Sequence, residues 1–275
     1  MTGLEEFGSI NIMQTREKIM IMETINDKKP RNIISQRRSP VFDAVAFLRS
    51  YFSIQPSYLI FFVTANCNAR CPHCFYRTEI EAANTSKELK LEEITKIAKS
   101  LNPLIYLSLA GGEPFLRPDL VEVVEMFYFQ SGIQYCNIVT NGFYAERIVK
   151  TAQMILKQCP SLKLKIQVSI DDFEPAHDEN RGVPGIYQNA IKTVRRLSAE
   201  IQDHGSRLTV DIATCFTKSN KTRIVKIHDH LRRELKFDNY QLLYPRGNAK
   251  DKEVKEVTPK EYKAVVELIE HKKKT

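Results

Sequence analysis

Three of the chain's six cysteines, Cys67, Cys71 and Cys74, stand in one short loop. A packed core does not need thiols at this density, whereas thiolates at this spacing can converge on a metal centre. A structural zinc site or a fully protein-ligated iron–sulfur cluster takes four protein donors, so three cysteines indicate an open coordination position or a fourth ligand elsewhere. His73 is a candidate for that ligand, although it is adjacent to Cys74. The loop alone leaves a small zinc site as an alternative.

The elements around this loop alternate between strand and helix patterns. An apolar, β-favouring run precedes the cysteines directly, and runs of the two kinds then follow one another along the chain. The spacing predicts strands over 58–64, 104–109, 135–140, 164–170, 208–214 and 240–244, and helices over 89–101, 119–129, 145–156, 185–203, 221–235 and 259–271. Strands that are each followed by a helix imply parallel pairing through right-handed crossovers. The fold class is therefore α/β, either a doubly wound sheet or a barrel.

Composition is that of an ordinary soluble globular protein, with 275 residues, 43% hydrophobic and 27% charged. A net charge of +8 favours anionic partners, but no basic stripe interleaved with aromatic residues predicts a nucleic-acid site. The amino terminus shows no signal-peptide pattern, and the longest apolar run, 59–63, is too short to span a membrane. We expect a cytoplasmic protein, in which thiols stay reduced and disulfides are disfavoured.

Unusual residues follow the predicted strands at their carboxyl ends, where the active sites of α/β folds lie. Gly111-Gly112-Glu113-Pro114 follows the second strand, and paired glycines let a ligand approach the main chain. Thr140-Asn141-Gly142 follows the third, and Ser169-Ile170-Asp171 the fourth. Taken singly, the glycine pair and Asn-Gly are also ordinary turn signals. Their recurrence at successive strand ends indicates one common site.

The Cys-x3-Cys-x2-Cys loop after the first strand, with the ring of His73 before the third cysteine, resembles the radical S-adenosylmethionine (SAM) superfamily. The GGEP and TNG elements and the SIDD…HDENRG run follow in that family's order. This resemblance implies a partial (β/α)6 TIM-like barrel. Before it, the polar, weakly periodic start of the chain and the apolar spacing that follows predict an N-terminal extension over 1–56, partly disordered with a helix near 41–52. The radical SAM core would cover 57–250 and a C-terminal helix 251–275.

The resemblance also implies a cofactor site. The three cysteines would hold three irons of a [4Fe-4S] cluster, and the fourth iron would bind the amino and carboxylate groups of SAM. No side chain is predicted as a catalytic group in its own right. His177 is expected to order the Arg181 loop, with a satisfied surface histidine as the alternative, and Cys136, Cys159 and Cys215 are expected to be inert thiols. The residues predicted to bind the cofactor are Gly111, Gly112, Glu113, Pro114, His73, Phe75, Asn141 (supported by Thr140), Ser169, Asp171 and Arg181.

The activity implied is reductive cleavage of SAM to methionine and a 5′-deoxyadenosyl radical, which abstracts hydrogen from an unidentified substrate. The branch resembled modifies peptides and proteins or makes cofactors and lipids, and an electron donor such as flavodoxin or ferredoxin would be a partner. No cysteine follows Cys215, so the resemblance does not include the cysteine-rich carboxyl-terminal extension of many relatives. The alternatives are a zinc-binding interaction module and a non-catalytic, cluster-binding partner subunit.

Overall fold

The computed structural model describes residues 56–272 except 248 and 250, all of which belong to the compact unit Arg37–Thr275. Within this range six strands form one parallel sheet in the order β1-β2-β3-β4-β5-β6. The two edge strands, β1 and β6, do not pair with each other, so the sheet is open. The strands are β1 (Tyr58–Thr64), β2 (Tyr106–Gly111), β3 (Tyr135–Thr140), β4 (Lys163–Ser169), β5 (Leu208–Cys215) and β6 (Tyr240–Leu243).

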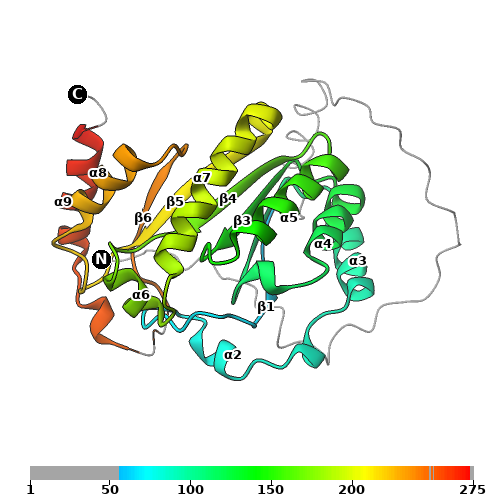
Figure 1. Cartoon of the computed structure of the whole chain (residues 1–275). Coiled ribbons are helices and arrows are strands. Elements are labelled where there is room, and N and C mark those ends of the chain that lie inside the picture. The colour runs from blue at the N-terminus through cyan, green and yellow to red at the C-terminus, as the bar shows by residue number, and fades with distance from the viewer. Residues whose placement is uncertain (1–55, 248, 250, 273–275) are drawn as a thin grey trace, which may run out of the picture. The chain divides into compact units, whose positions relative to one another are not determined.

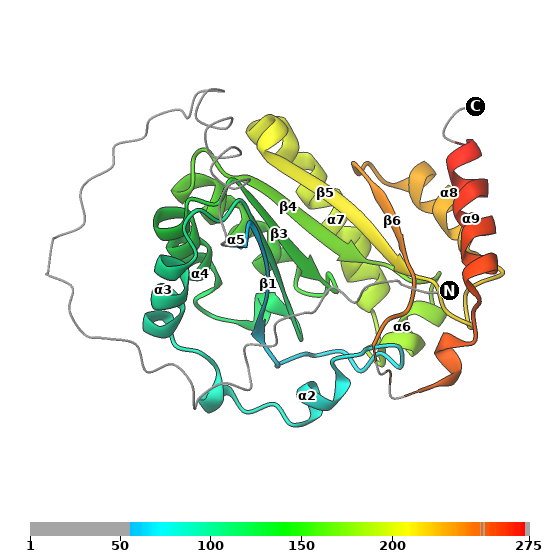
Figure 2. The ribbon, with the colours of Figure 1, turned by 180° about the vertical axis from the view of Figure 1, so that it is seen from behind.

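Helices connect the strands. The described helices are α2 (Arg77–Glu81), α3 (Leu91–Ser100), α4 (Leu120–Met126), α5 (Ala145–Gln158), α6 (Ala176–Arg181), α7 (Ile186–His204), α8 (Ile224–Glu234) and α9 (Pro259–Lys272). Short 3-10 turns are η2 (Thr85–Lys87), η3 (Pro114–Leu116), η5 (Gly205–Arg207) and η6 (Glu253–Lys255), and η4 (Phe127–Ser131) is a π-helical turn. Helices α5 and α7 lie in front of β3, β4 and β5 in Figure 1 and behind them in Figure 2.

The core lies between the sheet and these helices. Successive side chains of a strand point to opposite faces, and on the helix side Ile138, Ile166 and Val210 stand in register and are fully buried. On α5 the buried residues Ile148, Ala152 and Ile155 recur at helical spacing and belong to the same core. This packing fixes the carboxyl ends of the strands at one edge of the sheet, where the unusual residues stand.

At the carboxyl edge of the sheet, the loops that follow the two edge strands contact each other. A Cβ on Gly247, after β6, would lie 2.7 Å from the Cβ of Phe75, which follows the cysteines after β1. Gly247 has a φ of +64°, in the left-handed region that favours glycine. Phe75 also meets Phe62 of β1 edge to face, with ring centroids 6.2 Å apart. The loops after the first and last strands therefore pack together although the strands themselves do not.

The structure confirms the predicted α/β order and corrects several boundaries. β2 covers 106–111 instead of 104–109, so Gly111 is its last residue. The helix predicted over 119–129 ends at Met126 and continues as the π-helical turn, and the one predicted over 221–235 begins only at Ile224. The helix predicted over 259–271 is present as α9, and the residues before it from 251 are not α-helical. The helix near 41–52 and almost all of the extension fall outside the described residues, and the limits of the core stay predictions.

Candidate functional site

The cysteine loop packs against the end of β2 through main-chain contacts. Gly112 N donates to Thr64 O (2.8 Å) and Glu113 N to Asn66 O (2.6 Å). A Cβ on Gly111 would lie 2.3 Å from Thr64 O, and one on Gly112 would lie 2.0 Å from Asn66 O. The group that approaches the paired glycines in the structure is thus the backbone of the cysteine loop itself. Any larger residue here displaces that loop.

Glu113 links the glycine turn to the end of β3. Its Oε1 accepts from Thr140 Oγ1 (2.7 Å) and its Oε2 from Asn141 N (2.8 Å). Burial raises the pKa of Glu113 to about 7, although these donors favour the charged form. Asn141 Nδ2 in turn donates to Asn68 Oδ1 in the cysteine loop (2.8 Å). The GGEP and TNG elements and the cysteine loop therefore form one connected network.

The end of β4 supplies a buried ion pair. Arg181 Nη2 donates to Asp171 Oδ2 at 2.6 Å, and His73 Nε2 lies 3.6 Å from the same oxygen. Burial by itself would raise the pKa of Asp171, but the Arg181 guanidinium, with smaller contributions from His73 and His177, holds it well below its usual range. Asp171 raises the pKa of Arg181, so the pair is fully charged at neutral pH. The main chain of Arg181 also accepts from Arg70 N in the cysteine loop (2.8 Å).

Asp171 is held by further contacts. Cys215 N donates to its Oδ1 (2.9 Å), and Asp171 N donates to Nδ1 of the buried His177 (3.0 Å). Burial, followed by the Arg181 charge, lowers the pKa of His177 to about 3, so the imidazole is neutral and can accept this bond. His177 is fully buried, so the alternative of a surface histidine is wrong, and its ordering role stays a prediction that this bond supports. Arg181 Nε is buried without a hydrogen-bond partner.

The three loop thiols are half-buried. Burial, with smaller contributions from the charges of Glu113, Cys71 and Cys74, raises the pKa of Cys67 to about 11. Among the described residues, no three His, Cys, Asp or Glu side chains converge as ligands of a single metal ion. Thiolates are the ligands that iron–sulfur clusters take, and a cationic metal centre offsets the burial that keeps thiols protonated. The donor set fits such a cluster.

Two predicted site residues are less connected. Ser169 is half-buried at the end of β4 beside Ala213, and its side chain bonds to no other described residue. Phe75 is 46% exposed. Conversely, Asn220 was missed: its Nδ2 donates to Asp171 O and to Cys215 O, both at 2.8 Å. The sequence analysis also missed Asn68. The one feature of the sequence that could have indicated it is its position between the candidate ligands Cys67 and Cys71.

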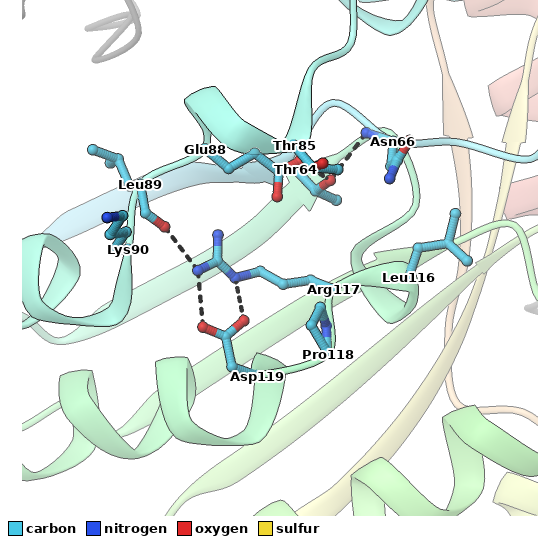
Figure 3. A pocket seen from close by; sticks show the side chains of 10 residues that line it. All are labelled: Thr64, Asn66, Thr85, Glu88, Leu89, Lys90, Leu116, Arg117, Pro118 and Asp119. Carbon is cyan, nitrogen blue, oxygen red and sulfur yellow. Dashed lines mark hydrogen bonds and ion pairs between the residues drawn. The ribbon is translucent and has the colours of Figure 1, made fainter.

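A pocket of about 330 Å³ lies behind the cysteine loop and is lined in part by Thr64 and Asn66. Figure 3 shows the Arg117 guanidinium in its wall, directed at Asp119 and at the carbonyl of Leu89. Arg117 Nη1 also donates to Val63 O (2.7 Å). All three nitrogens of the Arg117 guanidinium donate hydrogen bonds to protein groups, and Arg117 therefore stabilises the end of β1.

Comparison with known proteins identifies the family. Residues 61–231 match the model of the family described as the radical SAM superfamily. The chain belongs to the radical SAM superfamily. Its members use a [4Fe-4S] cluster and SAM. No helix in the described part of the chain is long and apolar enough to cross a bilayer.

Related radical SAM proteins differ in their activities. The chain is 30% identical over 136 residues to human molybdenum cofactor biosynthesis protein 1, covering 49% of this chain and 20% of that protein. It is 24% identical over 226 residues to the antilisterial bacteriocin subtilosin biosynthesis protein AlbA of Bacillus subtilis, covering 81% and 43%. The fold is similar to that of Streptococcus suis SuiB bound to its precursor peptide SuiA, with a TM-score of 0.60 and 16% identity over 91% of this chain and 56% of SuiB. The chain thus spans only part of each relative.

Proposed function

We propose that Cys67, Cys71 and Cys74 ligate a [4Fe-4S] cluster and that the enzyme cleaves SAM reductively at the carboxyl edge of the sheet. One observation carries the proposal. The cysteine loop is hydrogen-bonded to each neighbouring loop for which the sequence predicted a SAM contact: to Glu113, to Asn141 and to the main chain of Arg181. When bound, the cluster supplies the electron that splits SAM into methionine and a 5′-deoxyadenosyl radical.

The surrounding side chains suit the two charged ends of the methionine part of SAM. Glu113 offers a buried carboxyl group to the ammonium, next to the cysteine loop. Arg181 keeps a buried Nε–H that a carboxylate acceptor would satisfy, while Asp171 fixes the guanidinium from its other edge. His73 and Phe75 remain our candidates for the adenine contact, and Ser169 for the ribose.

The substrate and the electron donor are further parts of the proposal. The similarity to a bacteriocin biosynthesis protein, and the fold shared with a peptide-bound enzyme, support modification of a peptide or protein. The similarity to molybdenum cofactor biosynthesis protein 1 supports a small-molecule substrate in cofactor or lipid biosynthesis. A flavodoxin or ferredoxin would deliver the electron, in the cytoplasm, where the thiols stay reduced.

The test is anaerobic purification followed by metal analysis and incubation with SAM and dithionite. We expect about four irons and four sulfides per chain, and 5′-deoxyadenosine that forms only when reductant is present. One zinc per chain without iron would establish the interaction-module alternative. An intact cluster that yields no 5′-deoxyadenosine, even with candidate substrates, would establish the non-catalytic alternative.

A further inference from the structure

A chain of polar side chains crosses the face of the sheet that lies away from the helices, which is the near face in Figure 2. One member comes from each of β2 to β6, and we call the set the amide belt: Ser108, Asn137, Gln167, Asp211 and Gln241. Their neighbours along the strands, such as Leu109, Ile138 and Ile166, belong to the core on the helix side. Because side chains alternate along a strand, the belt residues share the opposite face.

Hydrogen bonds join the belt end to end. Asn137 Nδ2 donates to Ser108 Oγ (3.2 Å) and to Gln167 Oε1 (3.4 Å). Gln167 Nε2 donates to Gln241 Oε1 (3.3 Å), and Gln241 Nε2 donates to Asp211 Oδ2 (2.9 Å). The side chains are thereby held in fixed directions across five strands. A rigid row of amides is suited to recognising a defined hydrogen-bonding pattern.

One atom of the amide belt has no hydrogen-bond partner. Asn137 is only 7% exposed, and its Oδ1 is buried without a hydrogen-bond partner. An unsatisfied buried acceptor destabilises the fold unless a ligand or water supplies a donor. The Ser108 hydroxyl accepts from Asn137 and keeps its own proton available to donate. The belt therefore presents one acceptor and one donor side by side, as a partner for an amide group would.

The two lysines that β4 presents on this face are engaged. Lys165 Nζ lies 3.2 Å from the carboxylate of Asp211, which is completely buried and also accepts from Asn239 Nδ2 (2.9 Å). Lys163 Nζ donates to the hydroxyl of Tyr135 (3.4 Å) and lies over its ring. Phosphate groups are bound through arginine or lysine side chains that are free to pair with them. These two lysines are therefore not free to hold a polyphosphate, which favours a neutral ligand on the belt.

We propose that the amide belt binds the substrate and that the substrate is a neutral, amide-bearing molecule, namely a segment of polypeptide. This inference rests on the proposed function, since it places the substrate on the same face as the cofactor site. Gln167 precedes Asp171 by four residues, about 13 Å along an extended strand. A bound peptide segment spans that distance and reaches the cofactor site. Asn137 and Gln167 would then determine specificity for the peptide amide.

The experiment follows deuterium from substrate to product. Cells of the source organism are grown in deuterated medium, and their polypeptide and nucleotide fractions are each incubated with enzyme, unlabelled SAM and dithionite. One electron from dithionite breaks the S–C5′ bond, and the carbon–deuterium bond of a bound substrate then gives its deuterium to the 5′ carbon. Mass spectrometry measures the deuterated fraction of the 5′-deoxyadenosine, which is independent of the total yield.

We expect deuterium from the polypeptide fraction only. Asn137→Leu should lower the deuterated fraction at least tenfold and the milder Asn137→Ser by less, while Thr209→Val, on the same face beside Lys165 but outside the belt, should leave it unchanged. Thermal unfolding and iron content establish that each variant is folded. Deuterium from nucleotides, deuterium from neither fraction, or an Asn137→Leu result equal to wild type would overturn the inference. Absence of any 5′-deoxyadenosine would instead refute the proposed function.

Discussion

Gly112→Ala should prevent cluster assembly by displacing the cysteine loop. The new Cβ would lie 2.0 Å from Asn66 O, 2.5 Å from Asn66 C and 2.8 Å from Ala65 O, whereas ordinary contact begins at 3.4 Å. These are backbone atoms, so no side-chain rotation relieves the overlap, and the loop must move by about 1 Å. Overpacking of this kind costs about 1–3 kcal/mol, and a shift of about 1 Å exceeds the tolerance of about 0.5 Å for positioning ligands.

Gly132→Ala is the matched control. Gly132 has a φ of +74°, but no atom of the described residues lies within 4 Å of a Cβ built there, so the substitution adds backbone strain of about 1 kcal/mol without overlap with them. The assay measures iron and sulfide per chain after anaerobic reconstitution, with the midpoint of thermal unfolding of the apoprotein. Gly112→Ala should lose most of its iron and Gly132→Ala none. Equal iron and equal midpoints in the two variants would refute the steric argument.

Three further predictions concern the cysteines and the buried charges. Cys71→Ala should abolish cluster assembly and Cys159→Ala, in the core, should leave it intact; equal iron content would refute the ligand assignment. Asp171→Asn should destabilise the protein by about 3–5 kcal/mol in denaturant unfolding, because it leaves a buried guanidinium unpaired. Asp119→Asn, at a pair whose carboxylate is 31% exposed, should cost far less, and similar losses would contradict this ranking. Glu113 has a pKa of about 7, above its unfolded value, so its ionisation destabilises the apoprotein as pH rises from about 4 to 7, by on the order of 3 kcal/mol. Glu113→Gln should remove that slope, and an unchanged pH profile would contradict the assignment.

The strand order and most helices could be predicted from the sequence because buried apolar residues recur at the spacing of a strand or a helix. Ile166 stands between polar neighbours in its strand, and Ile148, Ala152 and Ile155 recur at helical spacing. The π-helical turn after Met126 could not be predicted, since Phe127 and Tyr128 continue the helical pattern and the change lies in the hydrogen bonding alone. The cysteine loop was found because its ligand types are rare and closely spaced.

The contacts within the site could not be predicted from spacing. Asp171 and Arg181 were each expected near the cofactor, but their ion pair depends on how the short helix α6 folds back on β4. The glycine pair was expected to admit a ligand, whereas the group packed against Gly112 is the backbone of the cysteine loop. The polar residues of the amide belt, such as Gln167, alternate with apolar ones as solvent-facing residues would. Their burial and mutual bonding arise only from the assembled sheet.

The central claim is that three cysteines leave one iron open for SAM. The most direct measurement is electron–nuclear double resonance on the reduced protein mixed with SAM that carries ¹⁵N in its amino group. We predict a ¹⁵N hyperfine coupling to the reduced cluster, absent when unlabelled SAM is used. An intact, reduced cluster that shows no such coupling at saturating SAM would contradict the claim.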